Sequence, residues 1–193
     1  MNRDVPKESC CGKETWFVVT EATDRATVVE RHFCKDHASV FLETYWPKPP
    51  YLAPHDVSAE WRTFDVESTL YETGEPNLGC WIMLREAKSV RRLAIRTGPF
   101  EVWAINLELG KIECPRPLTH RATLNTIRAL GATLNAVRID DFIPDQHVFH
   151  AKLDILHMGQ TTLVDVRPSD AVATALAGNV AILIGTRVFD KLG

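Results

Sequence analysis

Hydrophobic and polar residues alternate most clearly at positions 148–156. Alternation with a period of two predicts a β-strand that buries one face and presents the other to solvent. Similar stretches predict strands at 64–71, 81–84, 90–96, 137–141 and 161–166, and the continuous apolar run at 180–184 predicts a fully buried strand. On the strand at 148–156, the predicted apolar face carries Phe149, Ala151, Leu153 and Ile155, and the polar face carries His150, Lys152 and Asp154.

Three segments between these strands combine apolar residues at helical spacing with residue types that begin helices. Gly98-Pro99 predicts the start of the first helix, because proline suits the first helical position. Thr119 is the predicted N-cap of the second helix. The third helix is predicted to open at Pro168-Ser169-Asp170. The fold class that follows is α+β, with a mixed sheet and about three helices.

The N-terminal third of the chain has a different organisation. Residues 15–21 and 27–33 are rich in Val, Thr and aromatic residues, which predicts a β-hairpin, and residues 35–45 have helical spacing. Prolines between positions 47 and 54 fix extended backbone and disfavour helix. We therefore predict three parts, which are a Cys/His hairpin module with a short helix at 1–46, a Pro-rich linker at 47–63 and the main domain at 64–193.

The composition is that of an ordinary globular protein, since 45% of the 193 residues are hydrophobic and 24% are charged. No apolar run approaches the roughly 20 residues of a membrane span, and the polar start lacks a signal-peptide core, so we expect no membrane contact and a cytoplasmic location. The net charge of −3 argues against tight, sequence-independent nucleic-acid binding. The stretch 85–96 nevertheless carries five basic residues against one acidic residue, and is either a local nucleic-acid patch or a solvated strand and turn.

Cysteine and histidine residues flank the predicted hairpin. Cys10 and Cys11 precede it, and Cys34 and His37 follow it. Because an antiparallel hairpin brings its two ends together, these four side chains are predicted to converge as ligands of a structural Zn²⁺. Two alternatives are a site that recruits Glu8, and a hairpin held by aromatic packing without metal. The odd number of cysteines, five, argues against a disulfide framework.

The segment Cys11-Gly12-Lys13, the hairpin and Cys34-Lys-Asp-His37 together resemble the zinc-ribbon or treble-clef modules of some bacterial protease-adaptor proteins. Those modules carry a further cysteine three residues before the Cys-Gly-Lys cysteine, where this chain has Glu8. The resemblance is therefore to a degenerate module. It implies a protein partner that binds through this part of the chain.

Two motifs in the main domain carry a second resemblance. They are Arg116-Pro-Leu-Thr119-His120 and, about forty-five residues later, Asp165-Val-Arg167-Pro-Ser169-Asp170-Ala. With upstream residues between 81 and 105, they resemble the signature of the bifunctional nuclease family over roughly residues 64–193. The resemblance implies an α+β fold, self-association into a homo-oligomer, and nuclease activity on RNA and DNA.

The chemistry of both motifs is compatible with phosphodiester cleavage. Asp165 and Arg167 are predicted two residues apart on one strand face, and the other motif residues stand at two helix starts. If those helix starts face each other, His120, Asp165 and Asp170 become the catalytic residues. The carboxylates would bind Mg²⁺ or Mn²⁺, and the histidine would move protons. Arginines and helix N-termini favour phosphate, so the predicted substrate-binding residues are Arg116, Thr119, Arg167 and Ser169.

The same residues also suit structural roles, as helix caps and as an ion pair of Arg167 with Asp165 or Asp170. The chain departs from the family pattern at Arg121 and at residues 145–151, where two histidines, at 147 and 150, are alternative metal ligands. Three functions therefore stay open. They are a metal-dependent nuclease, a non-enzymatic oligomeric adaptor or regulatory protein that binds a partner through its Cys/His module, and a domain that binds a small anion at the helix starts.

Overall fold

The computed structural model describes residues 7–9, 11–12, 15, 17–22, 28–34, 36–37, 61–72 and 79–192. The predicted helix at 35–45 lies outside these residues except for Asp36 and His37, and the predicted linker lies outside them up to residue 60. The fold is α+β with a mixed sheet, as the sequence predicts. The chain divides into two compact units, which are described separately below.

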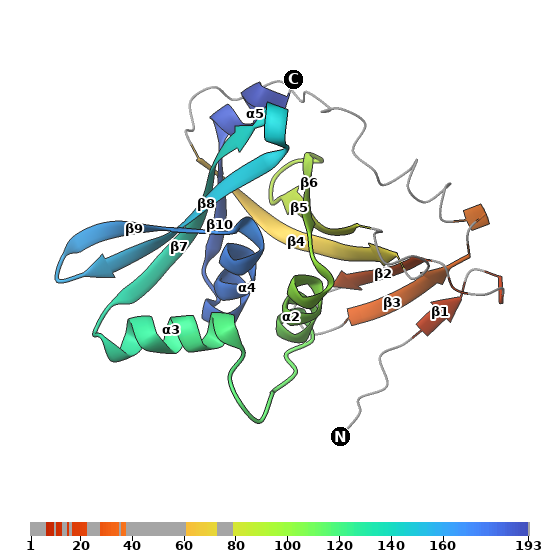
Figure 1. Ribbon diagram of the computed structural model, residues 1–193, viewed down its shortest axis with the longest axis horizontal. Helices are drawn as coiled ribbons and strands as arrows, with labels where there is room; N and C mark the ends of the chain where they lie inside the picture. Colours follow the sequence, from red (N-terminus) through yellow and green to blue (C-terminus); the bar gives the residue numbers. More distant parts are fainter. Residues whose placement is uncertain are drawn as a thin grey trace. The chain divides into compact units, whose positions relative to one another are not determined.

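The first unit contains the N-terminal strands and one helix (Figure 1). Its strands are β1 (Lys7–Ser9), β2 (Phe17–Ala22), β3 (Val28–Phe33), residues 66–72 of β4 (Trp61–Glu72), residues 80–84 of β5 (Cys80–Glu86) and β6 (Arg92–Thr97), and its helix is α2 (Pro99–Leu109). The strand order is β1-β3-β2-β4, with β5 paired to β4 and β6. β1 runs parallel to β3, whereas β2 is antiparallel to β3 and β4. The predicted hairpin is confirmed.

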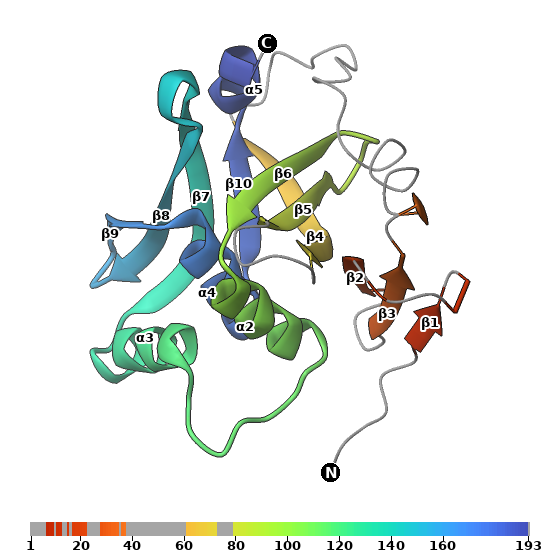
Figure 2. The same cartoon turned by 45° about the vertical axis from the view of Figure 1, so that its right-hand side comes forward.

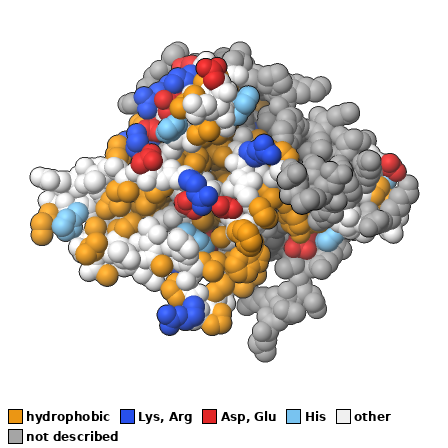
Figure 3. All heavy atoms as spheres, in the orientation of Figure 1, with side chains coloured by type: hydrophobic (Ala, Val, Ile, Leu, Met, Phe, Trp, Pro, Cys, Tyr) orange, Lys and Arg blue, Asp and Glu red, His pale blue; other side chains and the backbone are white. Residues whose placement is uncertain are grey.

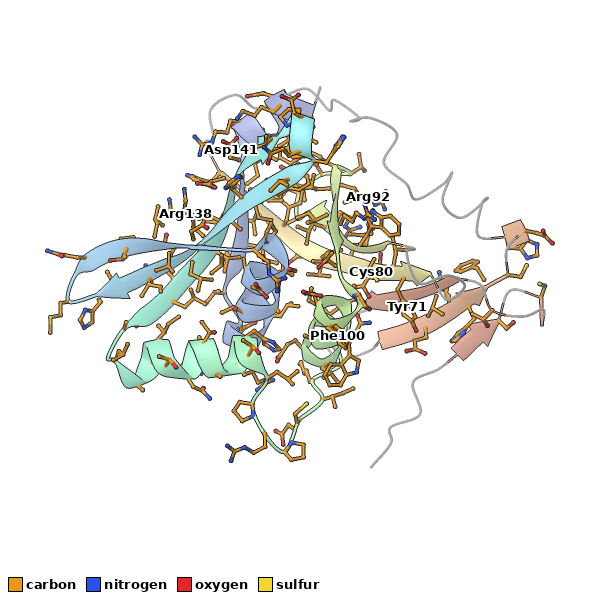
Figure 4. The ribbon with its side chains drawn as sticks, viewed as in Figure 1. Tyr71, Cys80, Arg92, Phe100, Arg138 and Asp141 are labelled. Carbon is orange, nitrogen blue, oxygen red and sulfur yellow. The ribbon has the colours of Figure 1, made fainter. Side chains whose placement is uncertain are left out.

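Helix α2 begins where the sequence predicts, with Pro99 at its first position. Val102 and Ile105 are buried, and the hydroxyl of buried Thr69 on β4 donates a 2.7 Å hydrogen bond to Oδ1 of Asn106. The opposite side of the helix is open, since Phe100 is 82% exposed (Figure 4). The side of α2 that carries Val102 and Ile105 is therefore buried, and Asn106 ties the helix to β4.

The second unit contains the longer C-terminal part of the chain. Its elements are residues 61–65 of β4, α3 (Thr119–Ala129), β7 (Thr133–Ile143), the 3₁₀ turn η1 (Pro144–Gln146), β8 (Val148–His157), β9 (Gln160–Val166), α4 (Pro168–Gly178), β10 (Ala181–Gly185) and α5 (Thr186–Leu192). The strand order is β4-β10-β7-β8-β9. Among the described residues of this unit, β10 pairs in parallel with β7 and the other strand pairs are antiparallel, so the sheet is mixed.

The strand at 148–156 follows its predicted alternation only in part, since Asp154 of the predicted polar face is 4% exposed and Ile155 of the predicted apolar face is half-buried. Ala151 and Leu153 are buried, and Lys152 lies between them on the polar face. A two-residue turn, Met158-Gly159, joins β8 to β9, and both residues have positive φ, which suits the right-handed twist of a hairpin. Figures 1 and 2 both show β9 at the margin of its sheet.

The core of the second unit lies between its sheet and helix α4. Residues 171–175 of α4 are all buried, and the helix packs on β7, β8 and α3. A helix that is buried on most of its surface needs small apolar side chains, and this stretch reads Ala-Val-Ala-Thr-Ala. Helix α5 was not predicted. Its Phe189 ring stacks on Phe64 at the start of β4, with the ring centroids 5.7 Å apart.

The basic stretch at 85–96 is not uniformly solvated, so that interpretation is wrong for Glu86 and Arg91, which are 6% and 4% exposed. Arg62 Nη1 lies 2.8 Å from Glu86 Oε1, and the Ser89 hydroxyl donates a 2.6 Å hydrogen bond to Oε2. The guanidinium of Arg91 lies over the Phe189 ring. These residues form the Glu86 cluster, which ties the β5–β6 turn to β4 and α5.

Candidate functional site

The strand register of the first unit explains why Cys11 and Cys34 come together. β1 pairs in parallel with β3, and Ser9 lies opposite His32. Two residues beyond each of these positions stand Cys11 and Cys34, so parallel strands deliver them to the same end of the sheet. Gly12, with a φ of +72°, turns the chain here, and its N–H donates a 3.1 Å hydrogen bond to Ser9 Oγ.

His37 completes a group of three donors. Its backbone N–H donates to the Cys34 carbonyl at 3.1 Å, and this turn brings its ring back to the cysteines. The Cys11 and Cys34 sulfurs lie 3.4 Å apart, and Cys34 Sγ lies 3.5 Å from His37 Nδ1. Around a tetrahedral zinc, two thiolate sulfurs lie about 3.8 Å apart, and a sulfur and an imidazole nitrogen about 3.6 Å apart. The three donors therefore have nearly the spacing of a zinc site.

Two further residues, Cys10 and His32, lie close in sequence to this Cys/His group. The ligand atoms of Cys11, Cys34 and His37 all lie within 4.8 Å of one another. Cys10 lies outside the described residues. His32 is engaged elsewhere, with its Nδ1 lying 3.4 Å from the Thr15 hydroxyl and its Nε2 lying 3.5 Å from a Glu30 oxygen.

The second predicted site lies where β9 passes into α4. Asp165 is exposed on β9, opposite Lys152 of β8. Arg167 is not part of the strand, so the prediction that it shares a strand face with Asp165 is wrong, because Arg167 is the N-cap of α4. Its Nε and Nη2 donate to the two carboxylate oxygens of Asp170 at 2.9 and 3.3 Å. Ser169 is buried, 6% exposed, in the first turn.

The other motif lies at the start of α3. Leu118, not Thr119, is the N-cap, and Thr119 is the exposed first residue of the helix, whose carbonyl accepts a hydrogen bond from the Thr123 hydroxyl. His120 is buried, 6% exposed. Arg116 is exposed before the helix.

Helices α3 and α4 pack on each other. One contact joins the end of α4 to the middle of α3, since a Cβ on Gly178 would lie 3.6 Å from Leu124 Cδ1. An eleven-residue helix is about 16 Å long, which separates the start of α4 from that contact. Within the described part of the chain, the Cys/His group is the one set of three donors within 4.8 Å, and His120, Asp165 and Asp170 do not form another.

A third group of polar residues was missed by the sequence prediction. It lies on the polar face of β7 and β8, where Arg138 Nε donates to Asp154 Oδ2 at 2.9 Å and Lys152 binds buried Asp140. Arg187 of α5 also binds Asp140. The alternation of β8 was the available signal for Lys152 and Asp154, but bulges in β7 and the unpredicted helix α5 hid the rest.

Charges of both signs are mixed on this part of the surface. Figure 3 shows blue and red side chains together near the top of the view, where Figure 1 labels α5. Lys191 of α5 donates a 2.5 Å hydrogen bond to Asp141, and this bond together with the N–H of Phe142 holds the pKa of Asp141 below its ordinary value. The cations here have carboxylate partners, so this face is not a purely basic surface.

The family model of the bifunctional nuclease domain matches residues 82–193, which is more than half of the chain. The chain belongs to the bifunctional nuclease domain family. Both motifs lie inside the matched region, whereas residues 64–81 and the Cys/His group lie outside it. This bifunctional nuclease domain therefore contains α3, α4 and all strands from β6 onward.

Two proteins of Mycobacterium tuberculosis are similar to this domain. They are the uncharacterized protein MT1877 of strain CDC 1551 / Oshkosh and the uncharacterized protein Rv1829 of strain ATCC 25618 / H37Rv. Each is 40% identical over 112 residues, which cover 58% of this chain and 65% of the relative. The match thus spans slightly less than two thirds of either relative. Among the described residues, no helix is long and apolar enough to cross a membrane.

Proposed function

We propose that this bifunctional nuclease domain is a divalent-metal-dependent nuclease that cleaves phosphodiester bonds of RNA, DNA or both. The family match supports the reaction class. The observation that supports the location is the exposed pair of Arg167 and Asp170 at the start of α4, two residues after Asp165. An arginine, two carboxylates and a helix N-terminus together are the groups that phosphoryl chemistry uses.

The donor types at the β9–α4 junction fit Mg²⁺ or Mn²⁺, which bind through one or two carboxylates and keep several waters. Such an ion would supply charge neutralisation and an activated water. Asp165 is exposed on β9. Asp170 now accepts hydrogen bonds from Arg167, whose side chain is 68% exposed. We propose that Arg167 turns to the substrate phosphate, which frees the Asp170 oxygens, and that Arg116 and Thr119 contact the substrate, whereas the burial of Ser169 keeps its side chain from that role.

His120 has a more limited place in this proposal. Its burial at the second position of α3 leaves little of the ring accessible. A general acid or base must reach the proton that it transfers, directly or through one water. We propose that His120 moves protons through such a water.

Carboxylate-to-amide variants test the proposal. Metal-stripped protein is incubated with single- and double-stranded DNA and with RNA, and Mg²⁺ or Mn²⁺ is added back. Asp165→Asn and Asp170→Asn are expected to abolish cleavage. The matched control is Asp141→Asn, which removes the carboxylate of another surface ion pair and leaves the β9–α4 junction intact. Cleavage that persists unchanged in both junction variants would overturn the proposed location.

We also propose that the Cys/His group binds one structural Zn²⁺, with Cys10 as the fourth ligand. The donor spacing of the other three residues supports this assignment. Zinc would cross-link the end of β3 to the turn after β1, in a segment too small for a large core. Elemental analysis of protein purified without chelator is expected to give one zinc per chain, and less than about 0.1 per chain would contradict the site.

The same Cys/His group favours a second candidate function, a non-enzymatic adaptor that binds a protein partner through the N-terminal module. The group lies outside the nuclease domain match, so the nuclease function does not account for it. The adaptor function predicts no cleavage of any substrate with any metal. The cleavage assay therefore separates the two candidates.

The outer edge of β9 supports self-association. In the described part of the chain β9 pairs only with β8, and Leu163 and Val164 are 46% and 41% exposed. An apolar edge strand pairs readily with another strand. We propose a homo-oligomer built by pairing of β9 with β9 of a second copy. Sedimentation is expected to show a dimer or larger, and Leu163→Lys is expected to shift the chain to monomer.

A further inference from the structure

The Cys/His group brings two thiols of unequal exposure together. Cys11 is exposed, whereas Cys34 is 4% exposed, and neither is in a disulfide. Their sulfurs lie 3.4 Å apart. A disulfide has a sulfur–sulfur bond of about 2.05 Å, so an approach of about 1.4 Å would join them. The short parallel strand β1 ends at Ser9, only two residues before Cys11, so the adjustment falls on a turn rather than within the sheet.

We propose that Cys11 and Cys34 form a dithiol modification site, which a low-molecular-weight disulfide oxidises to an intramolecular disulfide. Exposure decides the order of events. The thiolate of Cys11 attacks one sulfur of the small disulfide, a mixed disulfide forms on Cys11, and the other half of the reagent leaves as a thiolate. Cys34 is too buried to meet the reagent first, but it lies beside the Cys11 sulfur.

The second step is intramolecular. The thiolate of Cys34 attacks the Cys11 sulfur of the mixed disulfide, the protein disulfide forms, and the second half of the reagent leaves as a thiolate. Two protein thiols are oxidised and one small disulfide is reduced to two thiols, which take up the two protons. Neither step requires any reactant besides the small disulfide.

Oxidation and metal binding use the same two sulfur atoms. A sulfur that is bound to zinc does not attack a disulfide while it is bound, and a protein disulfide no longer offers thiolate ligands. Each state therefore excludes the other, and this coupling rests on the zinc site proposed above. Zinc is expected to slow the rate of oxidation by a factor of one plus the ratio of the zinc concentration to the dissociation constant of the site. Zinc at about 100 times that constant therefore slows oxidation about 100-fold.

Peptide mapping by mass spectrometry tests the dithiol site. The full-length, metal-stripped protein is treated with oxidised glutathione, the remaining thiols are alkylated, and the linked peptides are identified. The expected product joins Cys11 to Cys34. Cys34→Ser is expected to stop at the mixed disulfide on Cys11, and the matched control Cys114→Ser is expected to form the same Cys11–Cys34 link. If Cys34→Ser does not fold, the linked peptide of the wild type alone decides the site.

Two outcomes would overturn the dithiol site. One is a wild-type protein that stays fully reduced under these conditions, and the other is a dominant link between other cysteines, such as Cys10 with Cys34. Zinc separates this proposal from the metal site. A link that forms equally fast with and without Zn²⁺ supports the dithiol and contradicts the zinc site, whereas stoichiometric zinc binding without any link contradicts the dithiol alone.

Discussion

Replacement of Glu86 by glutamine should destabilise the second unit far more than the small change in shape suggests. The Glu86 carboxylate lies between the two guanidinium groups of its cluster, those of Arg62 and Arg91. The side chains of Glu86, Arg91 and Arg62 are 7%, 4% and 14% exposed. Glu86→Gln keeps the volume but removes the negative charge, so two poorly solvated cations lose the attraction of this carboxylate.

The contacts fix the size of the expected effect. The carboxylate accepts a 2.6 Å hydrogen bond from Ser89 and lies 2.8 Å from Arg62 Nη1, while Arg91 Nη1 is 3.9 Å from the same group. Removing one partner of a buried ion pair costs about 3–5 kcal/mol, and the retained amide oxygen favours the lower end, about 3 kcal/mol. For a protein of this size, such a loss lowers Tm by about 6–12 °C.

Glu67→Gln is the matched control, because Glu67 makes a two-point contact with Arg92 at 2.5 and 2.7 Å in a more exposed setting. Its side chain is 20% exposed and that of Arg92 is 33% exposed. More exposed pairs contribute about 0–1 kcal/mol, so this variant should lose no more than that. Urea unfolding followed by circular dichroism gives both free energies of unfolding. Equal losses in the two variants would refute the reasoning from burial.

The effect of Glu86 should also depend on pH. Burial raises the pKa of Glu86, but hydrogen bonds from Ser89 and Arg62, with the charges of Arg62 and Arg91, outweigh burial and hold this pKa below its ordinary value of 4.5. A lowered folded-state pKa gives stability that is fully present above the unfolded-state pKa and is lost as pH falls through the folded-state pKa. The difference between wild type and Glu86→Gln should therefore shrink below pH 4.5. A constant difference across that range would contradict the ion-pair interpretation.

Three further variants have defined outcomes. Arg167→Gln should lower kcat/KM by about 10–100-fold through loss of a charged hydrogen bond to phosphate. Its free energy of unfolding should change by less than about 1 kcal/mol, because the pair of Arg167 with Asp170 is exposed. A large loss of stability would assign Arg167 a structural role. Cys34→Ser should weaken zinc binding about 100-fold in competition with a chromogenic chelator, and unchanged affinity would exclude Cys34 as a ligand. Phe189→Ala should cost about 3–5 kcal/mol in urea unfolding, whereas the exposed Phe100→Ala should cost about 0.5 kcal/mol or less, and the reverse order would contradict the packing described for α5.

The elements with strong local signals were predictable from the sequence. The period of two at 148–156 located β8, and proline at the first turn located α2 and α4. The predicted N-cap of α3 was one residue too late. Thr119 is a residue type that suits the N-cap, but it stands immediately after Leu118, which is the N-cap. Helix α5 has seven residues, which are too few to show helical periodicity, and it follows β10 without an intervening loop.

The parts of the sites that depend on distant residues were not predictable. The hairpin brought Cys11 and Cys34 together as expected, but the parallel pairing of β1 with β3 that aligns them leaves no local pattern. The sequence prediction placed Glu86 in a solvent-exposed stretch of charged residues, because its partner Arg62 lies 24 residues earlier and leaves no local signal. For the two motifs, the residue types could be read from the sequence, whereas the positions of the two helix starts depend on how α3 and α4 pack on each other.

The dependence of cleavage on metal concentration tests the proposed nuclease function most directly. Metal-stripped wild-type protein is titrated with Mn²⁺ at a fixed concentration of labelled single-stranded RNA, and the initial cleavage rate is measured at each step, with a chelator-treated sample beside it. The proposal predicts a rate at background in chelator and a saturable rise with Mn²⁺. A rate that is independent of Mn²⁺ would contradict metal-dependent cleavage, and background rates at every Mn²⁺ concentration, also with DNA substrates and Mg²⁺, would favour the adaptor function.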